Sequence, residues 1–129
     1  MKEKLIMGNL AHCGIFVQDL QKAEDFYCGI LGFSKEYMFH DNVIFVQKGN
    51  LVLEIICDGK DHRKENKDEI RHIALSCKDI EKVYAFLVEK GVEVEERGIV
   101  KFEDFGANGC RFFMFRGPEQ ERLEFQEIL

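Results

Sequence analysis

The chain repeats one of its own stretches, and this internal repeat constrains the fold more than any other feature of the sequence. Residues 71–91, RHIALSCKDIEKVYAFLVEKG, restate residues 11–31, AHCGIFVQDLQKAEDFYCGIL, without a gap and with a constant offset of 60 positions. His12 thus corresponds to His72. We therefore expect two copies of one structural unit.

A second similarity follows each copy, and in each case it contains a glutamate behind a leucine. The stretch LVLEII surrounds Glu54 in the first copy, and ERLEFQ surrounds Glu124 in the second. Each unit therefore begins with a histidine and ends with a glutamate.

The length of the chain limits how the two units are arranged. A chain of 129 residues fits one compact domain, whereas a unit of about 60 residues buries little surface on its own. We expect a single domain over residues 1–129, built from two tandem modules at about 8–57 and 70–129. Residues 58–69, DGKDHRKENKDE, contain nine charged residues, one histidine and no apolar residue, which predicts a solvated linker between the modules.

The composition argues against several classes of protein. The chain has 46% hydrophobic and 33% charged residues, which is the balance of a folded globular protein. No apolar run approaches the roughly 20 residues that span a bilayer, and the N-terminal stretch lacks the apolar region of a signal peptide. We therefore expect a cytoplasmic protein with no membrane partner. The net charge of −6 and the lack of a Lys/Arg-rich stripe argue against nucleic acid as a partner.

The five cysteines are expected to be free thiols. Their number is odd and no two form a CxxC motif, which argues against a disulfide framework and against a thiolate zinc site. A free thiol behaves as a small apolar group, so we expect these side chains to be buried. They are Cys13, Cys28, Cys57, Cys77 and Cys110.

The first unit has the pattern of a strand, a helix and three further strands. Apolar and β-branched residues over 10–17 predict a strand. Asp19 is suited to cap a helix whose apolar residues recur at three- and four-residue spacing and which ends near Gly29 or Gly32. Three apolar stretches separated by turn signals then predict an antiparallel meander. They cover residues 33–40, 43–48 and 51–57.

The second unit follows the same plan. A strand is predicted over 71–77, followed by a helix that Asp79 caps and Gly91 ends. A Gly-rich loop over 103–109 is longer than its counterpart in the first unit, and such loops commonly lie over sites and move. Three strands are predicted over 92–102, with a break at Gly98, and over 110–116 and 121–129.

The alternation of side chains along a strand places both histidines on one side of the fold. In the first strand His12, Gly14 and Phe16 share a face that opposes an apolar one. We expect the amphipathic helix to cover the apolar face, which leaves His12 on the open side with a small residue beside it. The same parity applies to His72 and Ala74.

The two glutamates alternate with apolar neighbours, so Glu54 and Glu124 are also expected on the open, concave face. An unpaired charge buried there is costly. Two histidines and two glutamates that converge are mutually explained by a divalent cation, because imidazole and carboxylate suit zinc, nickel, cobalt, manganese or iron(II). Four protein ligands leave about two octahedral positions open, which is typical of a catalytic site. His40 and His62 lack a symmetric counterpart and are expected at the solvated surface.

Four short motifs follow one another along the chain. They are H-x-x-x-x-V-x-D-L at 12–20, FY-x-x-x-LGF at 26–33, HIALS at 72–76 and LEF at 123–125. Together they resemble the vicinal oxygen chelate superfamily, also called the glyoxalase/bleomycin resistance/dioxygenase fold. The resemblance implies an α+β fold in which two βαβββ modules form a curved, cup-shaped mixed sheet with helices on its convex side. It also implies a homodimer, with the cup built within one chain or across two.

The resemblance implies a metal site and a reaction. In that family the cup holds one metal ion that chelates two neighbouring oxygens of a small-molecule substrate. Matching positions here are His12, Glu54, His72 and Glu124, and the implied ion is Ni²⁺, Zn²⁺ or Co²⁺, with Mn²⁺ or Fe²⁺ as alternatives. A His/Glu/His/Glu set is most similar to glyoxalase I, the lactoylglutathione lyase.

The implied chemistry is proton transfer on a metal-chelated hemithioacetal formed from a 2-oxoaldehyde and a thiol. Chelation makes the neighbouring C–H acidic, and a carboxylate at the metal removes the proton. Glu124 is the expected base, with Glu54 as its symmetry-related counterpart. The proton then returns to the adjacent carbon, and the product is a thioester.

Two departures from the family pattern keep other functions open. The usual D-P-D-G turn is replaced by GPEQ at 117–120, and no set of arginines matches those that hold the carboxylates of glutathione, although Arg97, Arg111 and Arg122 are available. Alternatives within the superfamily are an epimerase, a thiol transferase for antibiotic resistance and an iron(II) dioxygenase. A non-catalytic small-molecule binding protein is the alternative of a different class, and the Phe-rich strand at 110–116 suits it.

Overall fold

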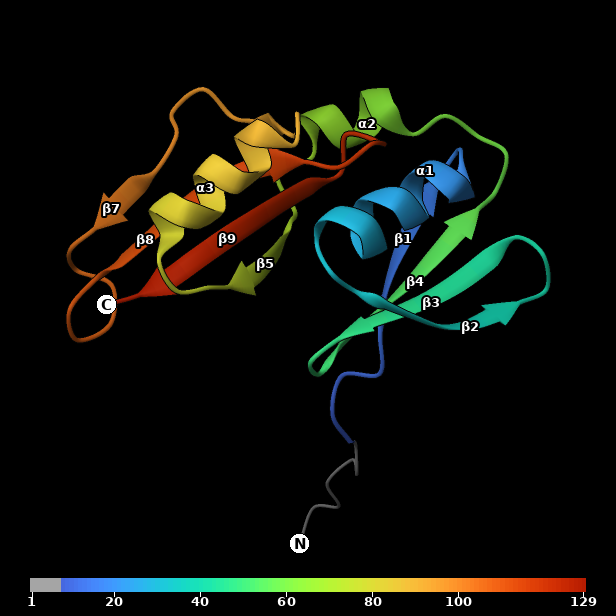
Figure 1. Cartoon of the computed structure of the whole chain (residues 1–129), viewed down its shortest axis with the longest axis horizontal. Coiled ribbons are helices and arrows are strands. Elements are labelled where there is room, and N and C mark those ends of the chain that lie inside the picture. The colour runs from blue at the N-terminus through green and yellow to red at the C-terminus, as the bar shows by residue number, and fades with distance from the viewer. Residues whose placement is uncertain (1–7) are drawn as a thin grey trace, which may run out of the picture.

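A computed structural model describes residues 8–129 and has an α+β fold of two βαβββ halves (Figure 1). Residues 1–7, on which the expectation of no signal peptide partly depends, lie outside the described part. We call residues 8–57 the first half and residues 70–129 the second half. The strands are divided between a four-stranded and a five-stranded sheet, each of them open and mixed. The α+β class that the family resemblance implies is therefore confirmed.

The first sheet belongs to the first half and has the strand order β1-β4-β3-β2. Its strands are β1 (Cys13–Val17), β2 (Ser34–Phe39), β3 (Val43–Lys48) and β4 (Leu51–Cys57). β1 runs parallel to β4, whereas the other two pairs are antiparallel. β1 is thus an edge strand beside the strand that carries Glu54.

The second sheet repeats this topology with the order β5-β9-β8-β6, and β7 also pairs with β8. Its strands are β5 (Ile73–Ser76), β6 (Glu93–Val94), β7 (Val100–Phe102), β8 (Cys110–Arg116) and β9 (Arg122–Ile128). β5 is an edge strand and runs parallel to β9, which carries Glu124. The predicted break at Gly98 is confirmed, because this residue has a left-handed φ of 61° between β6 and β7.

The helix of the first half is wider than its sequence spacing predicts. An α-helix, α1 (Leu20–Glu24), continues directly into a π-helical segment over Asp25–Ile30. The Leu31 N–H donates to the Phe26 carbonyl, five residues back, at 3.0 Å. This wider turn keeps the adjacent Phe26 and Tyr27 buried together with Leu31.

The two aspartates that the repeat equates have different conformations. The Asp19 carboxylate accepts a hydrogen bond from the Lys22 N–H at 3.1 Å, as predicted for an N-cap. Asp79 precedes α3 (Ile80–Glu89) but has a φ of 53° and makes no capping bond. Its N–H instead donates to the Glu127 carboxylate at 2.7 Å. The prediction of a second cap is therefore wrong, because an N-cap side chain reaches the first turn from an extended backbone.

The apolar core lies between the helices and the sheets, and α1 and α3 lie on the same side of them (Figure 1). A single cluster of buried residues draws members from both halves. Its strand residues alternate with Gly14, Glu54 and Glu124, so the helices cover the apolar faces and leave the His/Glu faces open. The cluster includes Ile15, Val17, Ala23, Tyr27, Leu53, Ile55, Ile80, Leu87, Phe113, Phe115 and Leu123.

The charged segment between the halves is more ordered than expected. A helix that the sequence analysis does not predict, α2 (Arg63–Asp68), forms within this segment and buries none of its residues, in agreement with the predicted solvation. The Asn66 side-chain amide donates to the Glu119 carbonyl at 3.0 Å, and the Arg116 guanidinium donates to the Asn66 carbonyl at 3.0 Å. These bonds attach α2 to the turn before β9.

A buried polar contact joins the two halves. The Tyr27 hydroxyl donates to the Glu121 carboxylate at 2.7 Å, and both side chains are buried. The other carboxylate oxygen accepts a hydrogen bond from the Glu119 N–H at 2.8 Å. Burial raises the pKa of Glu121 above its ordinary value. Gly117 lies against this carboxyl group, and a Cβ at that position would overlap it.

The helices and the thiols add two smaller findings. Within residues 8–129, no helix combines the length and the apolar character that crossing a membrane requires.

The five cysteines are free, as expected, but only Cys110 is fully buried and the others are partly exposed. Burial raises the pKa of the Cys28 and Cys77 thiols, which keeps both protonated at neutral pH.

Candidate metal centre

Two of the four predicted ligands, His12 and Glu54, lie close together at the open face of the first sheet. His12 lies one residue before β1, and Glu54 lies on β4 directly opposite Gly14. The His12 Nε2 atom is 3.4 Å from the Glu54 Oε1 atom. A Cβ built on Gly14 would lie 3.8 Å from that oxygen, so the small residue leaves room beside the carboxylate. The edge of the His12 ring also contacts Phe45, with ring centroids 5.5 Å apart.

The other two predicted ligands, His72 and Glu124, have the same arrangement, and their side chains are closer together. His72 lies one residue before β5, and Glu124 lies on β9 opposite Ala74. The His72 Nε2 atom is 2.9 Å from the Glu124 Oε1 atom. The Glu124 side chain is only 10% exposed, so its carboxylate is largely removed from water.

The hydrogen bonds of His72 restrict its protonation. Its Nδ1 atom lies 3.1 Å from the Ile70 carbonyl oxygen, and because a carbonyl only accepts, Nδ1 must carry the proton. A neutral ring then has a lone pair on Nε2 that faces the Glu124 carboxylate. A positive species, either a proton or a metal ion, is needed between these two acceptors. The donor set therefore fits a divalent cation that binds imidazole and carboxylate.

The two pairs are not brought to each other within one chain. Among residues 8–129, no three histidine, cysteine, aspartate or glutamate side chains are close enough together to hold a metal ion. Within one copy the four proposed ligands therefore form two separate pairs, and of the two arrangements that the sequence leaves open, within one chain or across two, the single chain does not assemble the first. The physical reason is that each pair lies on its own sheet, and the two sheets share no hydrogen-bonded strands.

A pocket of about 270 Å³ lies beside the second pair. Its polar lining consists of His72, Glu124, Gln126 and two arginines, Arg97 and Arg122. Its apolar lining comes from β7, β8 and the loop between them. These apolar residues are Phe102, Phe105, Cys110, Phe112 and Met114. The candidate chemistry thus lies in a small pocket with an apolar wall.

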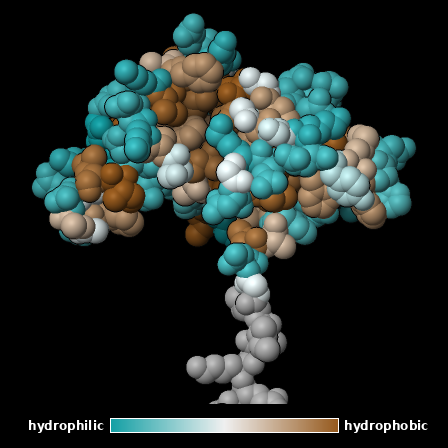
Figure 2. Space-filling model, turned by 60° about the horizontal axis from the view of Figure 1, so that its bottom comes forward, coloured by the Kyte–Doolittle hydropathy of each residue, from teal (hydrophilic) through white to brown (hydrophobic). Residues whose placement is uncertain are grey.

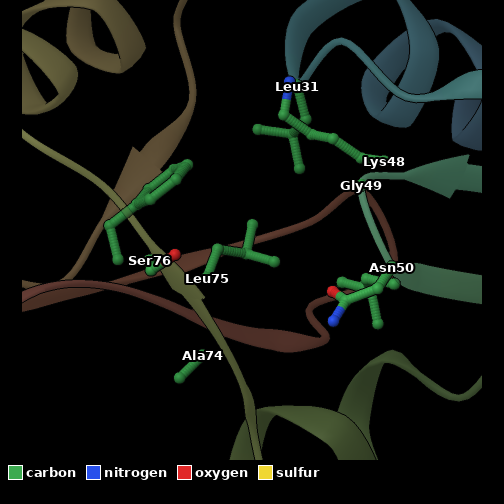
Figure 3. A pocket seen from close by; sticks show the side chains of 9 residues that line it. Leu31, Lys48, Gly49, Asn50, Ala74, Leu75 and Ser76 are labelled. Carbon is green, nitrogen blue, oxygen red and sulfur yellow. The ribbon is translucent and has the colours of Figure 1, made fainter. Parts of the chain in front are cut away.

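A second pocket of about 330 Å³ lies between the halves and contains none of the predicted ligands (Figure 3). The turn between β3 and β4 approaches β5 from the opposite side of this space. Its lining includes Lys48, Asn50, Leu75, Ser76 and Phe125. With no histidine or carboxylate in its wall, it is not the candidate centre.

The three arginines that the sequence makes available have different partners. Arg111 forms ion pairs with Glu81 and Glu127. Arg122 donates to both oxygens of Glu95, at 2.9 Å and 3.1 Å. Only Arg97 lines the pocket without an ion pair to any residue of 8–129.

Several residues near the two pairs are not among the site residues predicted from the sequence. Phe102 and Phe105 line the pocket from β7 and the Gly-rich loop, and the sequence signal for them was the predicted loop over a site. His62 is not simply solvated, because its ring packs 5.3 Å from Phe16 and its Nε2 atom lies 2.8 Å from the Asp58 carboxylate. No sequence pattern indicates this contact, since it depends on how α2 folds over β1. His40 lies exposed in the β2–β3 turn, as expected.

A sequence relative matches the chain over almost its whole length. The uncharacterized protein YwkD of Bacillus subtilis (strain 168) is 25% identical over 132 residues, which cover 95% of this chain and 99% of the relative. Its description carries no activity. The relationship therefore supports common ancestry without naming a reaction.

Several solved structures have the same fold. A glyoxalase family protein from Enterococcus faecalis is 27% identical, with a TM-score of 0.75 over 92% of this chain and 97% of that one. The fosfomycin resistance protein FosX from Listeria monocytogenes has a TM-score of 0.76 at 17% identity, covering 96% of each chain. A lactoylglutathione lyase from Agrobacterium tumefaciens has a TM-score of 0.70 at 14% identity, covering 95% of each chain. The last two likenesses show the fold alone.

The family comparison covers both halves and both His/Glu pairs. Residues 9–125 match the family described as the Glyoxalase/Bleomycin resistance protein/Dioxygenase superfamily. The matched range includes every residue that the sequence analysis proposes as a ligand. The duplicated βαβββ unit, the paired histidines and glutamates and this match together show that the chain belongs to the glyoxalase/bleomycin resistance protein/dioxygenase superfamily.

Proposed function

We propose that the protein is a metal-dependent enzyme of the glyoxalase I type, which moves a proton between adjacent carbons of a substrate with two neighbouring oxygens. The first substrate class to test is the hemithioacetal of a 2-oxoaldehyde. The observation that carries the proposal is His72, whose Nδ1 is bonded to a carbonyl and whose Nε2 faces the Glu124 carboxylate at 2.9 Å. A proton or a metal ion satisfies these two acceptors, and membership of the superfamily favours the metal ion.

The residues of this chain have distinct roles in the proposal. His12, Glu54, His72 and Glu124 are the proposed ligands of nickel, zinc or cobalt, with manganese or iron(II) as alternatives. A divalent ion held there supplies a Lewis acid for the two substrate oxygens. The Glu124 carboxylate takes the proton from the substrate carbon and returns it to the neighbouring carbon. The Ile70 carbonyl holds the His72 ring in the required tautomer.

We further propose that the site is completed by two copies of the chain. The His12/Glu54 pair of one copy would face the His72/Glu124 pair of another, since one copy keeps them apart. The open face of the first sheet supports this, because it exposes the aromatic residues Phe16, Tyr37 and Phe39. Exposed apolar side chains grouped around a half-site are typical of surfaces that another chain covers.

The direct test combines metal binding with turnover. Protein loaded with nickel, cobalt or zinc is analysed for bound metal, and is then mixed with methylglyoxal and a series of thiols while thioester absorbance is followed. Glu124→Gln should lower turnover by about 10²- to 10⁴-fold, the usual contribution of a general base. Glu65→Gln, which alters a glutamate on α2 whose side chain is 82% exposed, is the matched control and should keep full activity.

Two results would reject the proposal. One is protein that retains no stoichiometric metal with any of the ions. The other is a metal-loaded protein that turns over no combination of aldehyde and thiol. Oxygen consumption that depends on iron would instead assign the chain to the dioxygenases of the superfamily.

A non-catalytic binding protein is the second candidate. The separation of the ligand pairs within one chain and the apolar wall of the 270 Å³ pocket favour it. It predicts ligand binding with the same affinity in metal-free and metal-treated protein. Elemental analysis of gently purified protein separates the two candidates most directly.

A further inference from the structure

The pocket beside His72 and Glu124 has an aromatic wall that is open to solvent. Phe102, Phe105 and Phe112 line it from β7, the following loop and β8. The rings of Phe102 and Phe112 lie 5.3 Å apart, whereas Phe102 and Phe105 remain 49% and 45% exposed. Figure 2 shows hydrophobic residues gathered at the end of the molecule where Figure 1 places β7. Aromatic side chains held in this way suit a flat apolar group of a ligand.

One cation at this pocket, Arg97, makes no ion-pair contact with a carboxylate of residues 8–129. The Glu95 carboxylate is shared by Arg122 and by Arg116, which approaches it to 3.1 Å. Arg97 forms no ion pair within the described 122-residue span 8–129. Its guanidinium instead lies over the Phe112 ring, 5.3 Å from the centroid. The cation–π contact orients the guanidinium on the pocket wall and leaves its N–H donors available for an anion.

The local charge therefore differs from that of the whole chain. The chain has a net charge of −6, yet three arginines, Arg97, Arg116 and Arg122, act on the Glu95 carboxylate. The pocket adds one further carboxylate, Glu124, which acts on Arg122. Arg97 and Glu124 line the same pocket, so an anionic group at Arg97 and a reacting group at Glu124 would lie within one small ligand. One guanidinium matches one anionic group, since a fork of donors binds one carboxylate in a bidentate manner.

We infer that the substrate carries a flat apolar group, preferably an aryl ring, together with a single anionic group that binds Arg97. This inference rests on the proposed function, because that function places the two neighbouring oxygens of the substrate at His72 and Glu124. It identifies the substrate as a small aromatic monoanion rather than an adduct of glutathione, which has more than one carboxylate. Phe102 and Phe105 contact the ring, and Arg97 selects the charge.

Three unreactive diols test this assignment in the nickel-loaded protein by calorimetry. para-Carboxyphenylglycol has the ring, the charge and two neighbouring oxygens, phenylglycol lacks the charge, and glycerate lacks the ring. The first should bind at least about tenfold more tightly than either of the others, which corresponds to about 1.4 kcal/mol for each missing group.

Two variants separate the contributions of charge and ring. Arg97→Gln should remove the preference for para-carboxyphenylglycol over phenylglycol, and Arg97→Lys should restore part of it. Phe105→Ala, in an exposed loop, should remove the preference over glycerate. Arg63→Gln on α2, outside the pocket, is the control and should leave all three affinities unchanged.

The outcomes distinguish this inference from the proposed function. Equal binding of the three diols by nickel-loaded protein, or an unaltered preference in Arg97→Gln, would overturn the substrate assignment while metal binding stands. Absence of nickel binding, measured separately by elemental analysis, would instead overturn the proposed function and with it the premise of the inference.

Discussion

At the scale of single residues, two glutamates close together in the sequence have opposite surroundings. Glu124 faces the imidazole of His72 at the open side of the second sheet. Glu121 lies on the core side, where the Tyr27 hydroxyl and the Glu119 N–H donate to it. The first carboxylate is suited to chemistry, whereas the second is a buried structural group whose protonation affects stability.

Glu121 predicts a pH dependence of folding. Burial raises the pKa of this carboxyl above its ordinary value of 4.5, so the folded state binds the proton more tightly than the unfolded chain does. The protonated Glu121 stabilises the folded state relative to a charged one. This stabilisation is fully present at pH values below the ordinary pKa and is lost as the pH rises through the raised pKa. Glu121→Gln keeps an acceptor for Tyr27 without the charge. The free energy of unfolding of this variant should therefore not decrease with rising pH in the way that the parent's does, as measured by urea unfolding at a series of pH values.

The Tyr27 partner gives the control for that experiment. Tyr27→Phe removes the donor and leaves a buried carboxylate oxygen without its bond, which should cost about 1–3 kcal/mol at neutral pH. A Glu121→Gln variant whose stability falls with pH as steeply as that of the parent would contradict the assignment of the pH dependence to this residue.

At the scale of elements, the two helix starts provide a matched comparison. Asp19→Ala removes the observed cap of α1 and should destabilise the protein by about 0.5–2 kcal/mol. Asp79 makes no capping bond and has a left-handed backbone, which glycine adopts without steric cost. Asp79→Gly should therefore leave the free energy of unfolding unchanged or raise it slightly. Equal destabilisation by the two substitutions, measured by thermal unfolding, would show that both aspartates act as caps.

The same comparison shows which features of the elements are predictable. Strand parity depends on local alternation, so the open and covered faces of β1, β4, β5 and β9 follow from the sequence alone. The conformation of Asp79 depends on Glu127, which lies 48 positions away and accepts its N–H. The π-helical turn likewise depends on the packing of Phe26 and Tyr27 against both halves. Such features are tertiary, and a periodic pattern does not encode them.

At the scale of the whole molecule, the relative placement of the two sheets decides whether one chain contains a complete metal site or two separate half-sites. Parity predicted that His12, Glu54, His72 and Glu124 would all lie on open faces, and in the structure each histidine lies beside the glutamate of its own half. Their convergence depends on how two sheets are placed, for which the sequence contains no local signal. Arg97 was merely available in the sequence, because its significance depends on which arginines Glu95 neutralises.

A mixing experiment tests the proposed site between two copies. His12→Ala and Glu124→Ala should each be inactive alone. A mixed dimer would combine the intact first pair of one copy with the intact second pair of the other, which gives one complete site. Random re-association of equal amounts should therefore restore roughly a quarter of the parent activity, because about half of the dimers are mixed and each has one of its two sites intact.

A site confined to one chain would give a different result, since every chain in the mixture would carry a broken pair. No activity would then return after mixing. Sedimentation of the parent protein should independently show a dimer, and a monomer that is fully active would contradict the arrangement.

β1 and β5, the strands that follow the two histidines, are the edge strands of their sheets. An edge strand presents unpaired backbone N–H and C=O groups and can be extended by another strand. An ancestral protein of one βαβββ unit would have carried the same histidine beside the same open edge on every copy. Under the proposed function, two identical small subunits would have supplied the whole proposed ligand set before any duplication. Fusion of two such units would have placed both half-sites in one chain. Each half could then diverge, and the loop at 103–109 and the backbone of Asp79 differ from their counterparts in the first half.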